Sequence, residues 1–91
     1  MTKHQGPGTD SAIEETLRSY LADRLKTEVS VEQDLFESGL VSSMFAMELV
    51  VHLEKTFEVS ILGNDLRLAN FRTIRSMATL VRGLRDGDDR G

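Results

Sequence analysis

The chain has 91 residues, no cysteine and a formal net charge of −4. A chain this short forms one domain with a thin core, and the lack of cysteine excludes disulfides, thiolate nucleophiles and thiolate metal sites. No stretch approaches the roughly 20 apolar residues that cross a bilayer, and residues 1–8 lack the apolar core of a signal peptide. The negative charge argues against nucleic acid as a partner. We therefore expect a cytoplasmic protein that contacts neither membrane nor nucleic acid.

The charges are unevenly distributed along the chain. Between Glu28 and Asp65 there are eight acidic residues and a single base, Lys55. Between Leu66 and Leu84 there are four arginines and no acid. This distribution predicts that the middle of the chain meets basic partners.

The first predicted helix follows a tail. Residues 1–10 are rich in glycine and polar side chains, so we expect them to be flexible. From about 11 to 26 an amphipathic helix is predicted, because Ser11 and Glu14 have the spacing of a capping box. Apolar side chains then recur at intervals of three and four residues: Ile13, Leu17, Tyr20, Leu21 and Leu25.

A long loop and a second helix come next. Residues 27–41 have no helical period but are too apolar for a solvated linker, so we expect them to pack onto the core. Loops longer than about 12 residues in compact domains are usually functional. Residues 42–57 predict a helix that leaves Glu48, His52 and Lys55 toward water. Its inward stripe consists of Ala46, Leu49, Val50, Leu53 and Phe57.

The last part of the chain predicts a short helix and a long one. The short helix is expected around residues 66–71, and Thr73 can cap a final helix. The apolar positions of that helix are Ile74, Met77, Ala78, Val81 and Leu84. The expected fold is all-α, a small four-helix bundle with three longer helices and one short one. The domain would span residues 11–85, followed by a flexible tail at 86–91.

The inventory of side chains argues against catalysis. One histidine, His4, falls in the first tail, and the other, His52, on the polar side of a helix, without an evident partner for a nucleophile. The acidic residues do not follow the spacing of a Ca²⁺ loop, and no His or Cys cluster suggests zinc. We therefore expect no catalytic residue and no metal site, and we interpret His52 as a solvated helix residue.

The junction between the long loop and the second helix is the strongest candidate for a site. It reads FESGLVSSM over residues 36–44, so Gly39 leads into two serines that begin a helix. Serine is a favoured N-cap residue, and capping alone explains one of them. The second hydroxyl would lie exposed beside free backbone N–H groups at the positive end of a helix, where a negative group is stabilised.

This junction carries a resemblance to a known family. The segment DLFESGLVSSM at residues 34–44, followed by Glu48-Leu49, Leu53-Glu54 and Phe57, resembles the acyl and peptidyl carrier proteins. In that family the serine before a Leu or Met carries 4′-phosphopantetheine, and the matching residue here is Ser43. The resemblance implies a noncatalytic phosphoprotein whose arm supplies the missing thiol and holds an acyl group as a thioester.

One position departs from the family pattern. The family usually has Asp before the modified serine, and this chain has Ser42. Its hydroxyl can still cap the helix, but a negative charge near the metal of the modifying enzyme is missing. The partners that the resemblance implies are a phosphopantetheinyl transferase, an acyl-loading enzyme and polyketide synthase or tailoring enzymes, all acting on a monomer.

The outward side of the second helix is where such partners would dock. It is more apolar than an exposed face requires, and Phe45 in particular is expected to project away from the inward stripe. For Met47 and Val51, partial burial in the core is an equal alternative. Glu48 and Glu54 would form a charged rim that aids encounter. The expected partner-binding residues are Met44, Phe45, Met47, Glu48, Val51 and Glu54.

The cargo and the class of function remain open between several readings. Residues 43–50 and 70–74 resemble carriers loaded with a glyceryl unit for polyketide and antibiotic biosynthesis. A fatty-acid or peptidyl carrier is the alternative within the family. Outside it, a noncatalytic helical adaptor would bind a partner with the same helix and leave Ser43 unmodified. A hydrolase using Ser43 would need a base that the sequence does not offer.

Overall fold

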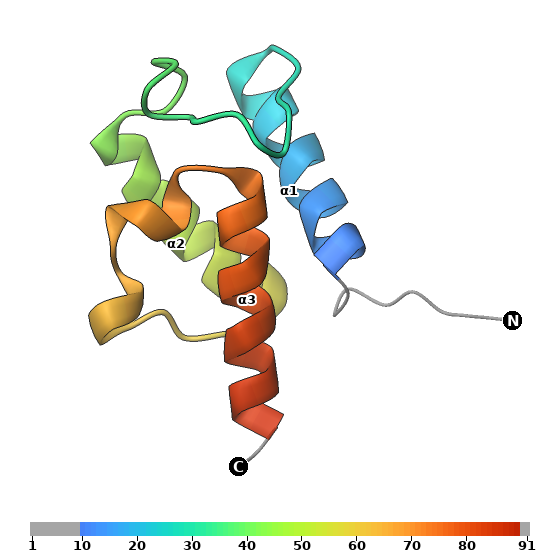
Figure 1. Ribbon diagram of the computed structural model, residues 1–91, viewed down its shortest axis with the longest axis vertical. Coiled ribbons are helices and arrows are strands. Elements are labelled where there is room, and N and C mark those ends of the chain that lie inside the picture. Colours follow the sequence, from blue (N-terminus) through green and yellow to red (C-terminus); the bar gives the residue numbers. More distant parts are fainter. Residues whose placement is uncertain (1–9, 90–91) are drawn as a thin grey trace, which may run out of the picture.

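The computed structural model describes residues 10–89, which form three α-helices and two short 3-10 turns (Figure 1). The helices are α1 (Asp10–Leu25), α2 (Ser43–Phe57) and α3 (Ile74–Asp89). The turns η1 (Gly63–Asp65) and η2 (Leu68–Phe71) lie between α2 and α3. The prediction of an all-α domain is confirmed, and the expected short helix is the turn η2. In this part of the chain no helix is both long and apolar enough to cross a membrane.

Both outer helices differ from their expected bounds. Helix α1 begins at Asp10, so Ser11 lies in the first turn and not at the cap position that its spacing to Glu14 predicted. Helix α3 continues to Asp89, although we expected a flexible tail from Asp86. Once a helix is nucleated, each further residue adds a backbone hydrogen bond, so a polar end can stay helical. Residues 1–9 and 90–91, also expected as tails, lie outside the described residues.

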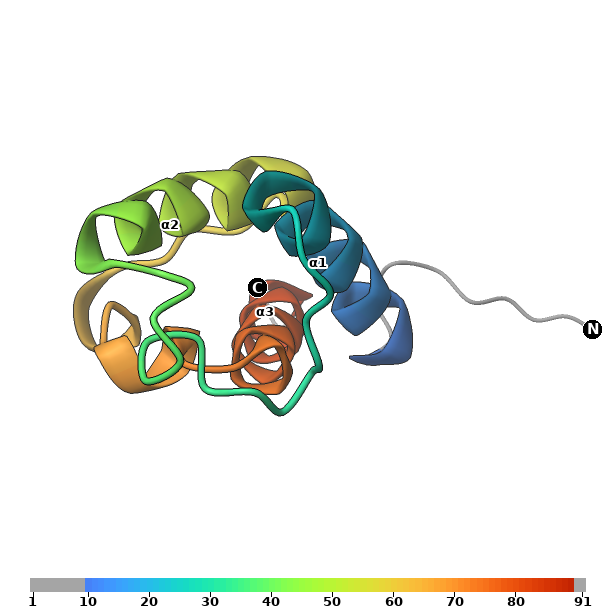
Figure 2. The ribbon, with the colours of Figure 1, turned by 90° about the horizontal axis from the view of Figure 1, so that it is seen from above.

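The core lies between the three helices, which surround a common interior in the view from above (Figure 2). Its positions follow the spacing of three and four residues that predicted the helices. Tyr20, Leu25, Val50 and Leu84, which were also expected inward, are only partly buried. The buried helix side chains are Ile13, Leu17 and Leu21 from α1, Ala46, Leu49, Leu53 and Phe57 from α2, and Ile74, Met77, Ala78 and Val81 from α3.

The long loop between α1 and α2 packs onto this core, as predicted. Val29, Leu35 and Val41 are buried in it. Backbone hydrogen bonds tie the loop to the region where α3 begins, because the Leu35 N–H donates to the Arg72 carbonyl at 2.7 Å and the Arg75 N–H donates to the Val31 carbonyl at 3.0 Å. The loop is therefore fixed by apolar burial and by the start of α3.

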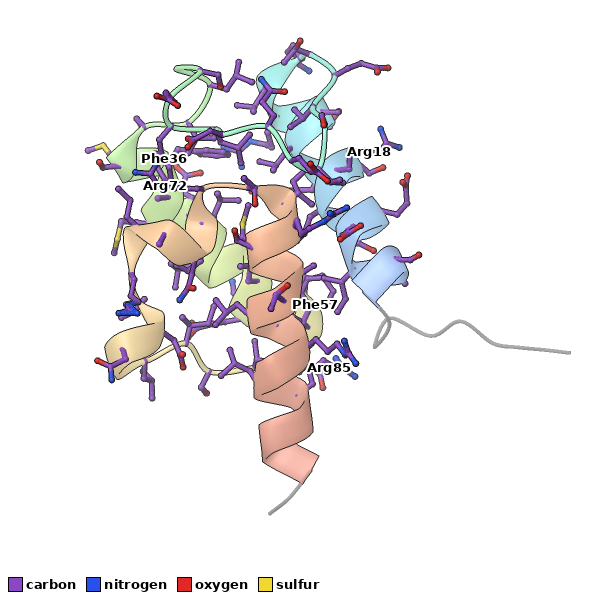
Figure 3. The ribbon with its side chains drawn as sticks, viewed as in Figure 1. Arg18, Phe36, Phe57, Arg72 and Arg85 are labelled. Carbon is purple, nitrogen blue, oxygen red and sulfur yellow. The ribbon has the colours of Figure 1, made fainter. Side chains whose placement is uncertain are left out.

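Two arginines near the start of α3, Arg72 and Arg75, neutralise acidic residues of the loop. Arg72, which is labelled in Figure 3, pairs with Asp34 at 2.8 Å. Hydrogen bonds from the Glu37 N–H, and then from Arg72, hold the pKa of Asp34 below its usual value. Arg75 pairs with Glu32 at 2.7 Å and with Glu14 at 3.5 Å. The acids of the middle of the chain are thus partly neutralised by the chain's own basic half.

The connection after α2 is also held by specific hydrogen bonds. The Glu54 carboxylate accepts from the Ile61 N–H at 2.8 Å, and Arg85 donates to the carbonyl of Phe57 at 3.0 Å (Figure 3). Glu58 ends α2 in the left-handed conformation, with φ of 57°. Glu54 is therefore half-buried and holds the connection after α2, while its expected place in a docking rim stays a prediction.

His52, which was expected toward water, is half-buried instead. Its ring stacks on Tyr20 of α1 with the ring centroids 3.6 Å apart and the planes at 9°. The Thr56 hydroxyl lies within hydrogen-bonding distance of the imidazole, at 3.3 Å from Nε2. Burial, and then the nearby Arg24 guanidinium, hold the pKa of His52 below its ordinary 6.5.

This shift gives the protein a defined pH dependence. Between pH 6.5 and the lower pKa of folded His52, the unfolded chain binds a proton that the folded chain does not. The free energy of unfolding should therefore fall as the pH drops below 6.5 and level off below the folded pKa. In urea unfolding at a series of pH values, His52→Phe, which keeps a ring against Tyr20, should lose less stability than the wild type. Equal losses in the two proteins would contradict this assignment.

Candidate attachment site

Ser42 caps α2. Its backbone is extended, with φ of −93° and ψ of 169°, and its hydroxyl accepts a hydrogen bond from the Phe45 N–H at 3.1 Å. Its carbonyl accepts the first helical bond, from the Ala46 N–H at 3.0 Å. The expected capping by Ser42 is confirmed, so the helix start does not need the Asp that this position usually holds in the resembling family.

The turn before the cap sets the direction of α2. Gly39 has φ of 81°, a left-handed conformation that glycine adopts without strain. Its N–H donates to the Phe36 carbonyl at 3.1 Å, and the Val41 N–H donates to the Leu35 carbonyl at 3.0 Å. Because Leu35 and Val41 are both buried, the chain enters the cap from a fixed point.

Ser43 is the first residue of α2, and its side chain is exposed. Among residues 10–89 its hydroxyl has no hydrogen-bond partner, and the N–H groups of Ser43 and Met44 have none either. The first turn of α2 holds no acid. An anion attached at Ser43 would therefore meet two free N–H donors and the positive end of the helix dipole.

A groove of about 270 Å³ begins at Ser43. It separates α2 from the η turns, and its wall is apolar apart from Ser43 and Arg67. An exposed hydroxyl, free N–H donors and a neighbouring groove together fit the attachment of a phosphate-linked arm. Sequence reasoning missed this groove, although the apolar residues 66 and 68 in a polar connection were a signal for it. The lining residues are Ser43, Ala46, Met47, Val50, Leu66, Arg67, Leu68 and Phe71.

Apolar side chains are exposed on both sides of the groove. On α2, Met44 is 77% exposed and Met47 is 64% exposed, and Val51 is also exposed. The alternative that Met47 and Val51 are core residues is therefore excluded. Three leucines of the following connection, Leu62, Leu66 and Leu68, are exposed as well. Several exposed apolar side chains on α2 and the following connection are typical of a surface that a partner covers.

The expected projection of Phe45 into solvent is wrong. Its ring is partly buried against the core, and the Arg24 guanidinium lies over it, 4.9 Å from the ring centroid. Arg24 also pairs with Glu48 at 2.9 Å. The end of α1 therefore covers Phe45 and neutralises Glu48, so the outward face of α2 is apolar and carries little free negative charge.

The surroundings of Ser43 do not supply a catalytic base or a metal. His52 follows nine residues later on the same helix, which places it about 13 Å further along the axis. Within residues 10–89 no group of three or more His, Cys, Asp or Glu side chains could hold a metal ion. The Ser43 hydroxyl is exposed, and within residues 10–89 no histidine lies beside it that would activate it for hydrolysis.

Comparison with known proteins supports this reading. Residues 15–81 match the family described as "Phosphopantetheine attachment site". The chain is 32% identical over 56 residues to a D-alanyl carrier protein of Lactococcus lactis subsp. lactis (strain IL1403). The aligned residues cover 62% of this chain and 71% of that protein. The chain is 33% identical over 51 residues to a D-alanyl carrier protein of Lactococcus lactis subsp. cremoris (strain MG1363), covering 56% and 65%. The matched range includes Ser43 and the whole groove.

Two substitutions on α2 distinguish an exposed side chain from a packed one by their effect on stability. Met47→Glu should change the free energy of unfolding by no more than about 0.5 kcal/mol, because the side chain is exposed. Phe45→Ala should lose a substantial part of the about 3 to 5 kcal/mol that a fully buried Phe contributes. Urea unfolding measures both. A Phe45→Ala protein as stable as the wild type would show that the ring does not pack under Arg24.

Proposed function

Because the chain belongs to the family of proteins with a phosphopantetheine attachment site, which are carriers without catalysis of their own, we propose that Ser43 accepts 4′-phosphopantetheine and that the chain carries an acyl group on this arm. The observation that carries the proposal is the exposed hydroxyl of Ser43. Ser43 is the first residue of α2, and its hydroxyl has no hydrogen-bond partner among residues 10–89. The helical-adaptor alternative gives this hydroxyl no role.

The chain's own residues place and stabilise the attachment. Ser43 Oγ forms a bond to the phosphorus of coenzyme A that carries the pantetheine. The pyrophosphate bond to that phosphorus breaks, adenosine 3′,5′-bisphosphate leaves, and the hydroxyl proton passes to a base of the transferase. The Ser42 cap fixes the first turn, and the N–H groups of Ser43 and Met44 face the new negative charge. The bound group supplies the thiol that this chain, having no cysteine, lacks.

The partner surface follows from the same geometry. We propose that the transferase and the loading enzyme contact Met44, Met47 and Val51, which are exposed on α2. Methionine side chains are flexible and polarizable, so they adapt to several partners. Glu48 is exposed but paired with Arg24, so charge would contribute less to docking than the acidic composition suggests.

Two classes of cargo have specific support. The resemblance of residues 43–50 and 70–74 to glyceryl-loaded carriers supports a small acyl unit for polyketide or related secondary-metabolite assembly. The similarity to D-alanyl carrier proteins supports an amino acid instead. Both are short cargoes joined through a thioester, and both need the same arm at Ser43.

The proposal predicts the outcome of one two-stage experiment. With coenzyme A, Mg²⁺ and a broad-specificity phosphopantetheinyl transferase, the wild type should gain the mass of one phosphopantetheine. Ser43→Ala should gain none, and Ser42→Ala should be modified more slowly, because it loses the cap that orders the first turn. Intact mass spectrometry follows all three proteins, and modification of Ser43→Ala would contradict the proposal.

The second stage offers cargo to the modified wild type. A glyceryl-loading enzyme with 1,3-bisphosphoglycerate, a malonyl transferase, and a D-alanine-activating enzyme with ATP are supplied separately. A glyceryl adduct would support the polyketide cargo, and a D-alanyl adduct would support the aminoacyl cargo. Efficient malonyl loading without either adduct would exclude both while leaving the carrier function intact.

A further inference from the structure

One cation lies on the wall of the groove that begins at Ser43. Arg67 is exposed, immediately precedes η2 and lines the groove together with Ser43. The other lining side chains are apolar, and no acid is among them. Figure 1 shows η2 as the orange turn near the start of α2, which agrees with the shared groove.

The backbone of Arg67 is held in place while its side chain is left without a partner. The Asn70 N–H donates to the Arg67 carbonyl at 2.9 Å, and the Asn70 side chain donates to the Asp65 carbonyl at 2.9 Å. Within residues 10–89 the Arg67 guanidinium makes no ion pair or hydrogen bond. Five other arginines of this part of the chain each have a partner side chain or carbonyl: Arg18, Arg24, Arg72, Arg75 and Arg85.

We propose that Arg67 pairs with the phosphodiester formed at Ser43 and directs the arm into the groove of about 270 Å³. This inference rests on the proposed function. The phosphorus of this phosphodiester is bonded directly to Ser43 Oγ. Its negative charge would therefore lie at the edge of the groove that Ser43 and Arg67 both line. A guanidinium offers paired N–H donors that match two phosphate oxygens, and the free N–H groups of Ser43 and Met44 would approach from the other side.

The pairing would decide between two routes for the arm. Met47 forms a ridge, because it lines the groove beside Ser43 and also a second groove of about 490 Å³ toward α1. The second groove is lined by Glu48, which Arg24 neutralises, and by Lys55, and it lies across Met47 from the groove that contains Ser43 and Arg67. Arg67 lies only on the η2 side of the ridge. It would therefore hold the arm against Leu66, Leu68 and Phe71.

The test compares apo and phosphopantetheinylated protein by thermal unfolding and by the phosphorus NMR shift of the modified form. The variants are Arg67→Gln, which removes the charge, and Arg67→Lys, which keeps the charge but not the paired donors. The matched control is Arg18→Gln, which removes a half-buried arginine of α1 that pairs with Glu15 and lines neither groove (Figure 3). Mass spectrometry confirms that only fully modified protein is compared.

Modification should raise the melting temperature of the wild type and of Arg18→Gln by the same amount. In Arg67→Gln the rise should be smaller by about 2 to 4 °C, the size expected of one surface ion pair in a domain of this length. Its phosphorus shift should move, and Arg67→Lys should be intermediate in both measurements. If Arg67→Gln resists modification, Arg67→Lys alone decides between the outcomes.

The inference is overturned if the Arg67 variants keep the full rise and the wild-type phosphorus shift. Arms loaded with acetyl or malonyl units, transferred from the corresponding coenzyme A thioesters, separate the phosphodiester from a cargo carboxylate. An effect of Arg67 that appears only with the malonyl unit would assign the residue to cargo and contradict the phosphodiester pairing. If the wild type gains no mass, the proposed function itself fails and the inference with it.

Discussion

The N–H of Leu35 donates to the carbonyl of Arg72 at 2.7 Å, and the carbonyl of Leu35 accepts from Val41 at 3.0 Å. These two bonds join the long loop, the start of α3 and the residue that precedes the Ser42 cap. Leu35 is fully buried, so the bonds are shielded from water and hard to exchange. The position of Ser43 relative to α3 and the η turns depends on this anchor, which the bond from the Arg75 N–H to the Val31 carbonyl and the pair of Arg72 with Asp34 reinforce.

This packing brings the acidic and basic segments of the chain together. The arginine-rich segment 66–84 packs against the acidic segment 28–65, as the pairs of Arg72 with Asp34 and of Arg75 with Glu32 show. Arg24 of α1 does the same to Glu48. What remains on the outward face of α2 is mainly apolar, and the free cation at Arg67 stands beside the site where a negative group would be attached.

Local features of the sequence were predicted well because they depend on near neighbours in the chain. The inward stripes, the cap at Ser42 and the exposed Ser43 follow from helical spacing and serine chemistry. The contacts that the sequence did not predict concern side chains whose environment comes from another element. Phe45 lies under Arg24, His52 stacks on Tyr20, and the Glu54 carboxylate receives the Ile61 N–H. No pattern within α2 could reveal these contacts, and the groove beside Ser43 exists only because η2 folds against α2.

The central claim is that one hydroxyl among several neighbouring serines bears the arm. Trypsin releases residues 27–55 of the modified wild type as one peptide, which contains Ser30, Ser38, Ser42 and Ser43. Fragmentation of this peptide in a tandem mass spectrometer locates the added group. The account predicts that every fragment containing Ser43 carries the added mass and that fragments ending at Ser42 do not. An arm on Ser42 or Ser38 would contradict it.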